Sequence, residues 1–296
     1  MPITDDQPSA SGSNGRTRLR LGFSPCPNDC VVFHALVHDP SLTDLRFEVV
    51  LDDVEALNTM ATARALDVAK ISYHAAAHLL PHWALLPSGG ALGRGVGPLV
   101  VTREALPDLA GRLVAIPGPL TTATLLLRLA EPEARTTVLR YDRIMPAVAA
   151  GEVDAGLIIH ESRFTYGEYG LRCHADLGAW WEVTTGEPIP LGAIAVRRTL
   201  SEPLQREVAR AVHASVAAAF RDPAASAAFV AAHAQEMDGA VRARHIALYV
   251  NDATLDLGET GRRAAQRLLQ AARRLHGLPE SRLDPFVDWR PDPEGP

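Results

Sequence analysis

His160 stands where an apolar segment ends and a polar cluster begins, a position suited to acid–base chemistry. Residues 155–159 have the pattern of a buried strand, and Glu161 and Arg163 follow the histidine closely. In α/β proteins the carboxyl ends of strands bind ligands, and an imidazole can accept or donate a proton near neutral pH. The residues alone leave two interpretations open: a general base, or a structural histidine at the end of a strand.

Two predicted helix starts could bind an anion. Thr121 and Thr122 follow a predicted strand over 112–117 and open the apolar-periodic run 125–129. Free N–H groups in the first turn of such a helix, together with the two hydroxyls, can hold a carboxylate. Simple N-capping by one threonine would use the same residues. The segment 24–29 also has the composition of a helix start, and a well-capped turn is the alternative there.

Cysteine and histidine side chains suggest two other chemistries. Cys26 could be a nucleophile, but no motif supplies a partner histidine, so helix entry is the favoured role. His74, His78 and His82 are spaced by four, and two of them on one helical face could bind a metal. Pro81 interrupts the helix before His82, and no glutamate completes a His-Glu-x-x-His motif. We therefore expect no metal site here, and favour solvated or capping histidines.

The glycine-rich segment 89–97 does not indicate a nucleotide cofactor. It holds five glycines in nine residues, yet it matches neither the dinucleotide fingerprint nor the phosphate-binding loop. Such a segment suits a backbone that approaches a ligand or turns sharply between lobes. A flexible surface loop is the alternative.

The elements that must position these residues follow an α/β pattern. Short strand-like runs, each followed by turn or capping residues and a helical pattern, occur at 19–24, 45–51, 68–72, 112–117, 137–140 and 153–160. Beyond about residue 197 we predict helices only, because apolar residues recur every four over 204–220 and 264–275. This order predicts two α/β lobes, a helical tail packed on the first lobe, and a ligand cleft between the lobes.

Composition narrows the class of protein further. The chain has 296 residues, of which 47% are hydrophobic and 22% charged, enough for a substantial core. A net charge of −6 gives no reason to expect a nucleic-acid partner, and 3 cysteines suit a reducing compartment. No apolar run approaches the length of a membrane span, and the start of the chain lacks the features of a signal peptide. We expect a cytoplasmic protein with a small-molecule ligand.

Eight segments, taken in order, carry a resemblance to a known family. They are Ser24-Pro-Cys-Pro-Asn-Asp29, Lys70-Ile-Ser-Tyr73, residues 89–98, Thr121-Thr-Ala123, Tyr141-Asp-Arg-Ile144, residues 156–166, Trp180-Trp181 and Pro190-Leu-Gly192. Over residues 19–278 the chain resembles the 1,4-dihydroxy-6-naphthoate synthases of the futalosine route to menaquinone. The resemblance implies a two-lobed, periplasmic-binding-protein-like fold of type II. It also implies cleavage of cyclic dehypoxanthinylfutalosine to 1,4-dihydroxy-6-naphthoate and dihydroxyacetone, without a metal or an organic cofactor.

The same resemblance assigns roles to individual residues. His160 matches the catalytic base, and Ser72, Thr122 and Ala123 match substrate-contacting positions, with Asn58 as a further candidate in the cleft. Thr121 would contribute to the helix start that holds the substrate carboxylate. Cys30 is a departure, because the family usually has threonine there, and a thiol is a weaker hydrogen-bond partner than a hydroxyl.

The expected division is a disordered tail over 1–17, a large lobe over 18–100 and 198–290, and a small lobe over 101–197. A noncatalytic binding protein for a small carboxylate on the same fold is the alternative, because function resides in the site and not in the fold.

Overall fold

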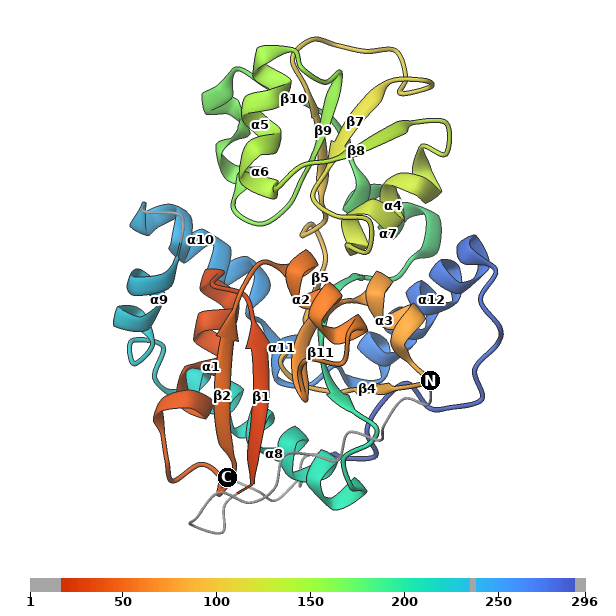
Figure 1. Ribbon diagram of the computed structural model, residues 1–296. Helices are drawn as coiled ribbons and strands as arrows, with labels where there is room; N and C mark the ends of the chain where they lie inside the picture. Colours follow the sequence, from red (N-terminus) through yellow and green to blue (C-terminus); the bar gives the residue numbers. More distant parts are fainter. Residues whose placement is uncertain (1–16, 235–237, 291–296) are drawn as a thin grey trace.

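The computed structural model describes residues 17–234 and 238–290, so the predicted tail lies almost entirely outside the described residues. Figure 1 shows two lobes, each built around one sheet, with the C-terminal helices packed against the lobe that contains the N-terminal strands. Among the described residues, no helix combines the length and the apolar character that crossing a bilayer requires.

The first sheet has six strands. They are β1 (Arg18–Phe23), β2 (Arg46–Leu51), β3 (Val68–Ser72), β4 (Trp83–Leu85), β5 (Ala91–Gly93) and β11 (Ile189–Arg197). The order is β2-β1-β3-β11-β4, and β5 also pairs with β11. β1 is parallel to β2 and β3, whereas β11 runs antiparallel to β3, β4 and β5.

β11 corrects one predicted boundary. The sequence analysis assigned residues up to 197 to the small lobe, but β11 makes its hydrogen-bonded pairs with β3, β4 and β5. The strand therefore belongs to the first sheet, and the chain returns from the small lobe before Ile189, eight residues earlier than Arg197. The structure confirms that the described chain contains only helices and an isolated bridge, between Leu85 and Phe286, after β11.

The second sheet has five strands in the order β10-β6-β9-β7-β8. They are β6 (Leu99–Thr102), β7 (Leu113–Ile116), β8 (Arg135–Val138), β9 (Ala155–Ile158) and β10 (Arg172–Asp176). β9 lies between β6 and β7 and is parallel to β7, so its carboxyl end lies beside the end of β7 that leads to α4. This brings the segment after β9 and the segment after β7 to one edge of the sheet.

Helices cover both sheets (Figure 1). In the first lobe and its C-terminal cover they are α1 (Pro27–His38), α2 (Val54–Thr62), α3 (Tyr73–Leu79), α8 (Glu202–Arg221), α9 (Ala227–His233), α10 (Gly239–Tyr249), α11 (Asp252–Leu255) and α12 (Gly258–His276). In the second lobe they are α4 (Thr122–Ala130), α5 (Tyr141–Ala150), α6 (Ser162–Thr165), the short 3-10 helix η1 (Tyr166–Tyr169) and α7 (Leu177–Thr185). The sequence pattern predicts helices in the regions of α1, α2, α8 and α12.

Glycine is required where the connection that enters the second lobe meets the start of α7. The backbones of Gly97, in the segment entering β6, and Gly178, in the first turn of α7, approach so closely that a Cβ on either would overlap the other. Part of the glycine-rich segment therefore allows close packing of backbone on backbone, a role that the sequence did not predict.

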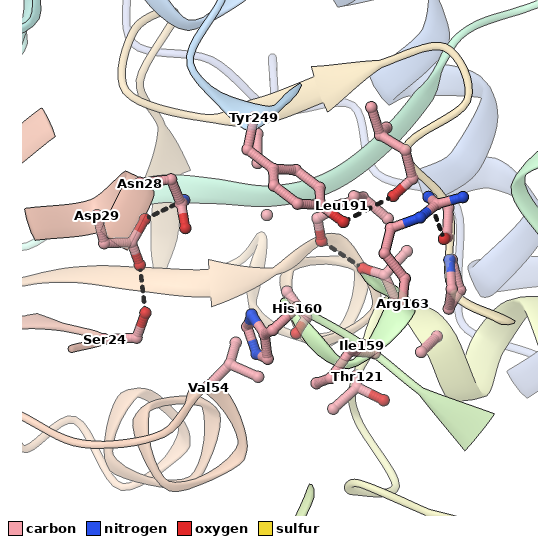
Figure 2. A pocket seen from close by; sticks show the side chains of 18 of the residues that line it. Ser24, Asn28, Asp29, Val54, Thr121, Ile159, His160, Arg163, Leu191 and Tyr249 are labelled. Carbon is pink, nitrogen blue, oxygen red and sulfur yellow. Dashed lines mark hydrogen bonds between the residues drawn. The ribbon is translucent and has the colours of Figure 1, made fainter. Parts of the chain in front are cut away.

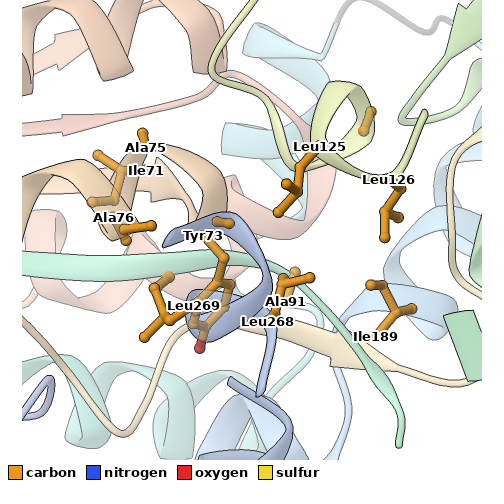
Figure 3. Close-up of a cluster of buried hydrophobic side chains, with 14 of the residues drawn as sticks. Ile71, Tyr73, Ala75, Ala76, Ala91, Leu125, Leu126, Ile189, Leu268 and Leu269 are labelled. Carbon is orange, nitrogen blue, oxygen red and sulfur yellow. The ribbon is translucent and has the colours of Figure 1, made fainter. Parts of the chain in front are cut away.

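The largest hydrophobic core extends across both lobes. It contains Leu57 and Ile71 from the first lobe together with Leu125 and Leu126 of α4, and it also includes Leu268 of α12 (Figure 3). Because this cluster is continuous, the contact between the two lobes buries apolar side chains.

Candidate active site

A pocket lies between the two lobes (Figure 2). The space between its walls, counting the part open to solvent, is about 720 Å³. The walls come from the ends of β1, β3 and β9 and from the starts of α1 and α4. The segment that leads into β6 also contributes, as do β11 and α10. The lining residues include Ser24, Asp29, Lys70, Ser72, Gly97, Thr121, Thr122, Ala123, His160, Arg163, Leu191, His245 and Tyr249. The predicted cleft is therefore present and has residues of both lobes.

His160 occupies the position in the pocket that its sequence context predicts. It follows β9, and its backbone has φ = +58°, a left-handed conformation that costs a non-glycine residue energy and is enriched at functional sites. Its Nδ1 lies 3.4 Å from the Sγ of Cys26, and its ring meets the ring of Tyr141 edge-on at 5.5 Å. Desolvation lowers the pKa of His160, although Glu161 and Asp29 act in the opposite direction. The imidazole is therefore neutral at neutral pH and available as a base.

Cys26 supplies a contact that no sequence motif reveals. It is buried immediately before α1, and the thiol reaches His160 across 134 residues of sequence. Burial, and secondarily the charges of Glu161 and Asp29, raise the pKa of Cys26 well above its ordinary value. A protonated thiol is a poor nucleophile, so the structure favours a role in orienting His160 over direct attack.

Lys70 and Asp29 form a buried ion pair in the pocket wall. The Lys70 Nζ lies 2.6 Å from Asp29 Oδ1, and both side chains are almost fully buried. Asp29 also accepts hydrogen bonds from Ser24 Oγ at 2.7 Å and from Asn28 Nδ2 at 2.9 Å. In the sequence, Lys70 stands out only as part of the segment Lys70-Ile-Ser-Tyr73. A lysine inside the otherwise apolar strand 68–72 is the signal that could have marked it, because lysine is rarely buried without a partner.

The start of α4 is a helix N-terminus open to the pocket. Thr121 is the N-cap, and its Oγ1 accepts the N–H of Thr124. The N–H groups of Thr122 and Ala123 belong to the first turn, which has no intrahelical acceptors. Thr122 Oγ1 donates to the carbonyl of Leu191 in β11 at 2.6 Å, so its proton is used to join the lobes. The donors left for a carboxylate are therefore backbone N–H groups.

Ser72 lines the pocket, whereas Asn58 lies behind it. Asn58 is completely buried, and its Oδ1 accepts the N–H of Ser72 at 2.9 Å. Its Nδ2 donates to Ser72 Oγ at 3.2 Å and to the carbonyl of Leu120 at 3.4 Å. Asn58 is thus placed to hold Ser72 and the segment before α4 in position, and it is not among the residues that line the pocket.

α10 contributes pocket residues that the sequence analysis did not identify. His245 Nε2 donates to Asn28 Oδ1 at 2.8 Å, and its Nδ1 lies 3.8 Å from Glu161 Oε2. Neither Nδ1 nor Oε2 has a hydrogen-bond partner among the described residues. Burial first, then the positions of His160 and Lys70, lower the pKa of His245 to about 3. His245 lines the pocket, and its Nδ1, which faces Glu161, still has hydrogen-bonding capacity.

The other cysteine and histidine candidates lie outside the pocket lining. Cys30 packs in a small apolar cluster, and its thiol donates to the carbonyl of Pro25 at 3.5 Å. The departure from threonine at this position therefore affects a backbone contact and not the pocket wall. His82 contacts Arg64, while His74 and His78 lie on α3 and are not among the residues that line the pocket.

Two curated proteins are similar to this chain over most of their length. One, from Streptomyces coelicolor, is 52% identical over 260 residues, covering 86% of this chain and 92% of that protein. The other, from Thermus thermophilus, is 53% identical over 254 residues, covering 86% of this chain and 93% of that protein. Both are named 1,4-dihydroxy-6-naphthoate synthase.

Solved structures confirm the predicted fold class. The crystal structure of protein AF1704 from Archaeoglobus fulgidus has a TM-score of 0.83 and 37% identity, covering 88% of this chain and 98% of that one. The alkanesulfonate-binding protein SsuA from Xanthomonas axonopodis pv. citri has a TM-score of 0.68 at 17% identity, covering 92% and 96% of the two chains, which shows a shared periplasmic-binding-protein-like fold. A family model described as menaquinone biosynthesis matches residues 19–274, and the chain belongs to this family.

Proposed function

We propose that the protein is a carbon–carbon lyase that converts cyclic dehypoxanthinylfutalosine to 1,4-dihydroxy-6-naphthoate and dihydroxyacetone. One observation carries the assignment: His160 stands in a left-handed backbone conformation in the inter-lobe pocket of a chain 52% identical to a curated synthase of this kind. The residues that the sequence resemblance assigns to catalysis and binding line this pocket, except Asn58, which lies behind its wall.

The reaction begins with proton removal. His160 takes the proton of the hydroxyl next to the bond that breaks, this C–O becomes a carbonyl, and the carbon–carbon bond gives its electron pair to an acceptor in the neighbouring ring. Aromatisation of that ring supplies driving force. The imidazole needs a free nitrogen to act as the base. If that nitrogen is Nε2, the ring proton is on Nδ1 and points to Cys26 Sγ at 3.4 Å.

Charge on the substrate and on the intermediate is held by groups of both lobes. The N–H groups of Thr122 and Ala123 bind the substrate carboxylate at the start of α4. The ammonium of Lys70, fixed by Asp29, stabilises negative charge that develops on the ring acceptor. Closure of the lobes keeps water from the charged intermediate.

Incubation of the purified full-length chain with cyclic dehypoxanthinylfutalosine tests the assignment directly. We expect 1,4-dihydroxy-6-naphthoate and dihydroxyacetone in equal amounts, detected by chromatography and mass spectrometry. Saturable binding of the substrate with no product would instead support the noncatalytic carboxylate-binding protein. We place the reaction in the cytoplasm, in keeping with three cysteines that are all unpaired in the structure.

A further inference from the structure

Three imidazoles from distant parts of the sequence meet beside α3. His74 and His78 lie one turn apart on α3, and His276 is the last residue of α12, which packs against α3. Figure 1 shows these two helices side by side. The rings of the three histidines lie 4.8–5.8 Å from one another, and one nitrogen of each lies within 4.8 Å of the others.

Two of the three imidazoles in this cluster, those of His74 and His78, offer a metal ion a nitrogen that donates to no protein group, and His276 must first move its ring proton from Nε2 to Nδ1. His74 Nδ1 donates to the carbonyl of Thr121 at 3.1 Å, which leaves its Nε2 without a proton and directed at His276 Nε2, 2.7 Å away. A backbone carbonyl that fixes the tautomer of a ligating histidine is typical of metal sites. His78 Nε2 is buried and has no hydrogen-bond partner among the described residues. Desolvation lowers the pKa of all three imidazoles, so they are neutral.

The distances are close to those of a tetrahedral site. Zn–N bonds of 2.0–2.1 Å at tetrahedral angles put ligand nitrogens about 3.3 Å apart. His74 and His276 would separate slightly and His78 would move inward, changes that side-chain rotation can supply. The nearby guanidinium groups of Arg128 and Arg273 lower the pKa of these histidines and would also oppose a cation, so they limit the affinity.

We propose that His74, His78 and His276 form a binding site for a transition-metal ion of the zinc class, with water completing the coordination. The site links α3, α12 and, through the bond from His74 to Thr121, the N-cap of α4 in the other lobe. Its role is to clamp these three elements together and not to take part in the reaction. Three neutral nitrogens suit Zn²⁺, Ni²⁺ or Cu²⁺ and not Mg²⁺ or Ca²⁺, which prefer oxygen.

Calorimetric titration of the chelator-treated, dialysed full-length protein with ZnCl₂ tests the site. We expect one Zn²⁺ per chain and a higher unfolding temperature with Zn²⁺ but not with Mg²⁺. His78→Gln should weaken binding at least about tenfold, as losses around metal sites commonly do. His276→Gln should do the same and serves as a second variant if His78→Gln does not fold. His82→Gln is the matched control, because His82 contacts Arg64 outside the cluster, and it should bind like the parent.

A second group of possible metal ligands lets the experiment distinguish between two binding sites. The ligand atoms of Cys26, His160 and Glu161 also lie within 4.8 Å of one another. Cys26→Ser should leave Zn²⁺ affinity unchanged, and the Co²⁺-loaded parent should lack a thiolate-to-cobalt charge-transfer band. The proposal is wrong if the parent shows no saturable binding, if neither glutamine variant weakens it, or if the thiolate band appears and Cys26→Ser removes the binding. These readouts are independent of the lyase assignment.

Discussion

At the scale of single residues, His160 combines a strained backbone with a neutral imidazole. A left-handed conformation at a non-glycine residue costs about 1–3 kcal/mol, and the surrounding structure must offset it. Desolvation lowers the pKa of the ring, which keeps it unprotonated while the neighbouring Glu161 and Asp29 can stabilise the imidazolium once a proton arrives. The environment thus supports a group that must gain a proton during the reaction.

Replacing His160 by asparagine should remove the chemistry and leave binding largely intact. Loss of a general base typically lowers the rate by about 10²- to 10⁴-fold, and we expect kcat to fall by that factor with little change in substrate Kd. Steady-state kinetics and calorimetric binding measure the two quantities. His38→Asn, an exposed substitution at the end of α1, is the control. If His160→Asn turned over substrate at close to the parental rate, the general base would be Glu161 or a bound water instead.

The lowered pKa of His160 also sets the pH dependence of the rate. The base form predominates above its pKa, and desolvation moves that pKa below the ordinary 6.5. We therefore expect kcat/KM to stay level from neutral pH down through 6.5 and to fall only at more acidic pH. A pH–rate profile in a constant-ionic-strength buffer series measures this limb. An acid limb centred above pH 6.5 would contradict a desolvated His160 as the base.

Cys26→Ser should retain most of the activity. The hydroxyl keeps a hydrogen-bonding group near His160 Nδ1, and the raised pKa of the thiol argues against a thiolate nucleophile. We expect kcat within a few-fold of the parent, against a loss of several orders of magnitude for a true nucleophile. Mass spectrometry of the parent during turnover provides the complementary measurement, since a covalent substrate adduct on Cys26 would overturn this view.

At the scale of elements, the start of α4 joins the two lobes and faces the substrate. Thr122 Oγ1 donates to the carbonyl of Leu191, and Thr122→Val would leave that half-buried carbonyl without this donor. We expect the free energy of unfolding to fall by about 1–3 kcal/mol and substrate Kd to rise, because the helix start loses its attachment to β11. Thr122→Ser keeps the hydroxyl and is the matched control. Equal substrate affinity in the parent and Thr122→Val would mean that the attachment of α4 to β11 does not help to position the carboxylate site.

Elements with strong local patterns could be predicted from the sequence. β1, β2, β3, β7 and β9 lie within one to two residues of the predicted strands, as does the long helix α8, whereas α12 ends one residue after its predicted run but begins six residues before it. β8 was predicted two residues too late. β4, β5 and β6 are only three or four residues long, β10 is largely polar, and β11 contains Pro190 and Gly192, which interrupt a strand pattern. Their pairing depends on strands far away in the sequence, so local periodicity did not reveal them.

The same distinction applies to the candidate site. His160, Thr121, Thr122 and Ala123 follow predicted strands directly, and the edge of a sheet collects such segments. His245 was missed because it lies in a weakly amphipathic stretch beside arginines, a context typical of a solvated face. Only the packing of α10 on α1 buries it against Asn28. Contacts made by the tertiary fold leave little trace in local sequence.

At the scale of the whole molecule, buried titratable groups couple the stability of the fold to pH. Ionising the carboxyl group of Glu55 in α2 is unfavourable, because burial raises its pKa to about 7. The side chain packs there against Gly118 and Leu120 of the other lobe. A raised carboxyl pKa stabilises the fold below pH 4.5, and this contribution is lost as pH rises through about 7. Buried histidines with a lowered pKa instead stabilise the fold at high pH and lose this contribution as pH falls, over nearly the same pH range. The effect of one histidine on the free energy of unfolding is therefore measured by comparing the parent with a variant of that histidine.

His245 offers that comparison. Its pKa is about 3 in the fold and about 6.5 when unfolded, so the unfolded chain binds more protons between these values. Its contribution to stability is fully present above pH 6.5 and is lost as pH falls toward 3. The stability of the parent relative to His245→Gln should therefore decrease by up to about 2.7 kcal/mol from pH 6.5 to 4.5, at about 1.4 kcal/mol per pH unit.

Urea unfolding of the parent and His245→Gln, followed by tryptophan fluorescence at several pH values, measures this difference. Glutamine can still donate to Asn28 Oδ1, and the contribution of Glu55 is common to both proteins and cancels. The window from pH 6.5 to 4.5 lies above the range in which most carboxylates titrate, which separates the histidine from general acid unfolding. A difference between the two proteins that stays constant across this window would mean that His245 is not held neutral by burial between α10 and α1.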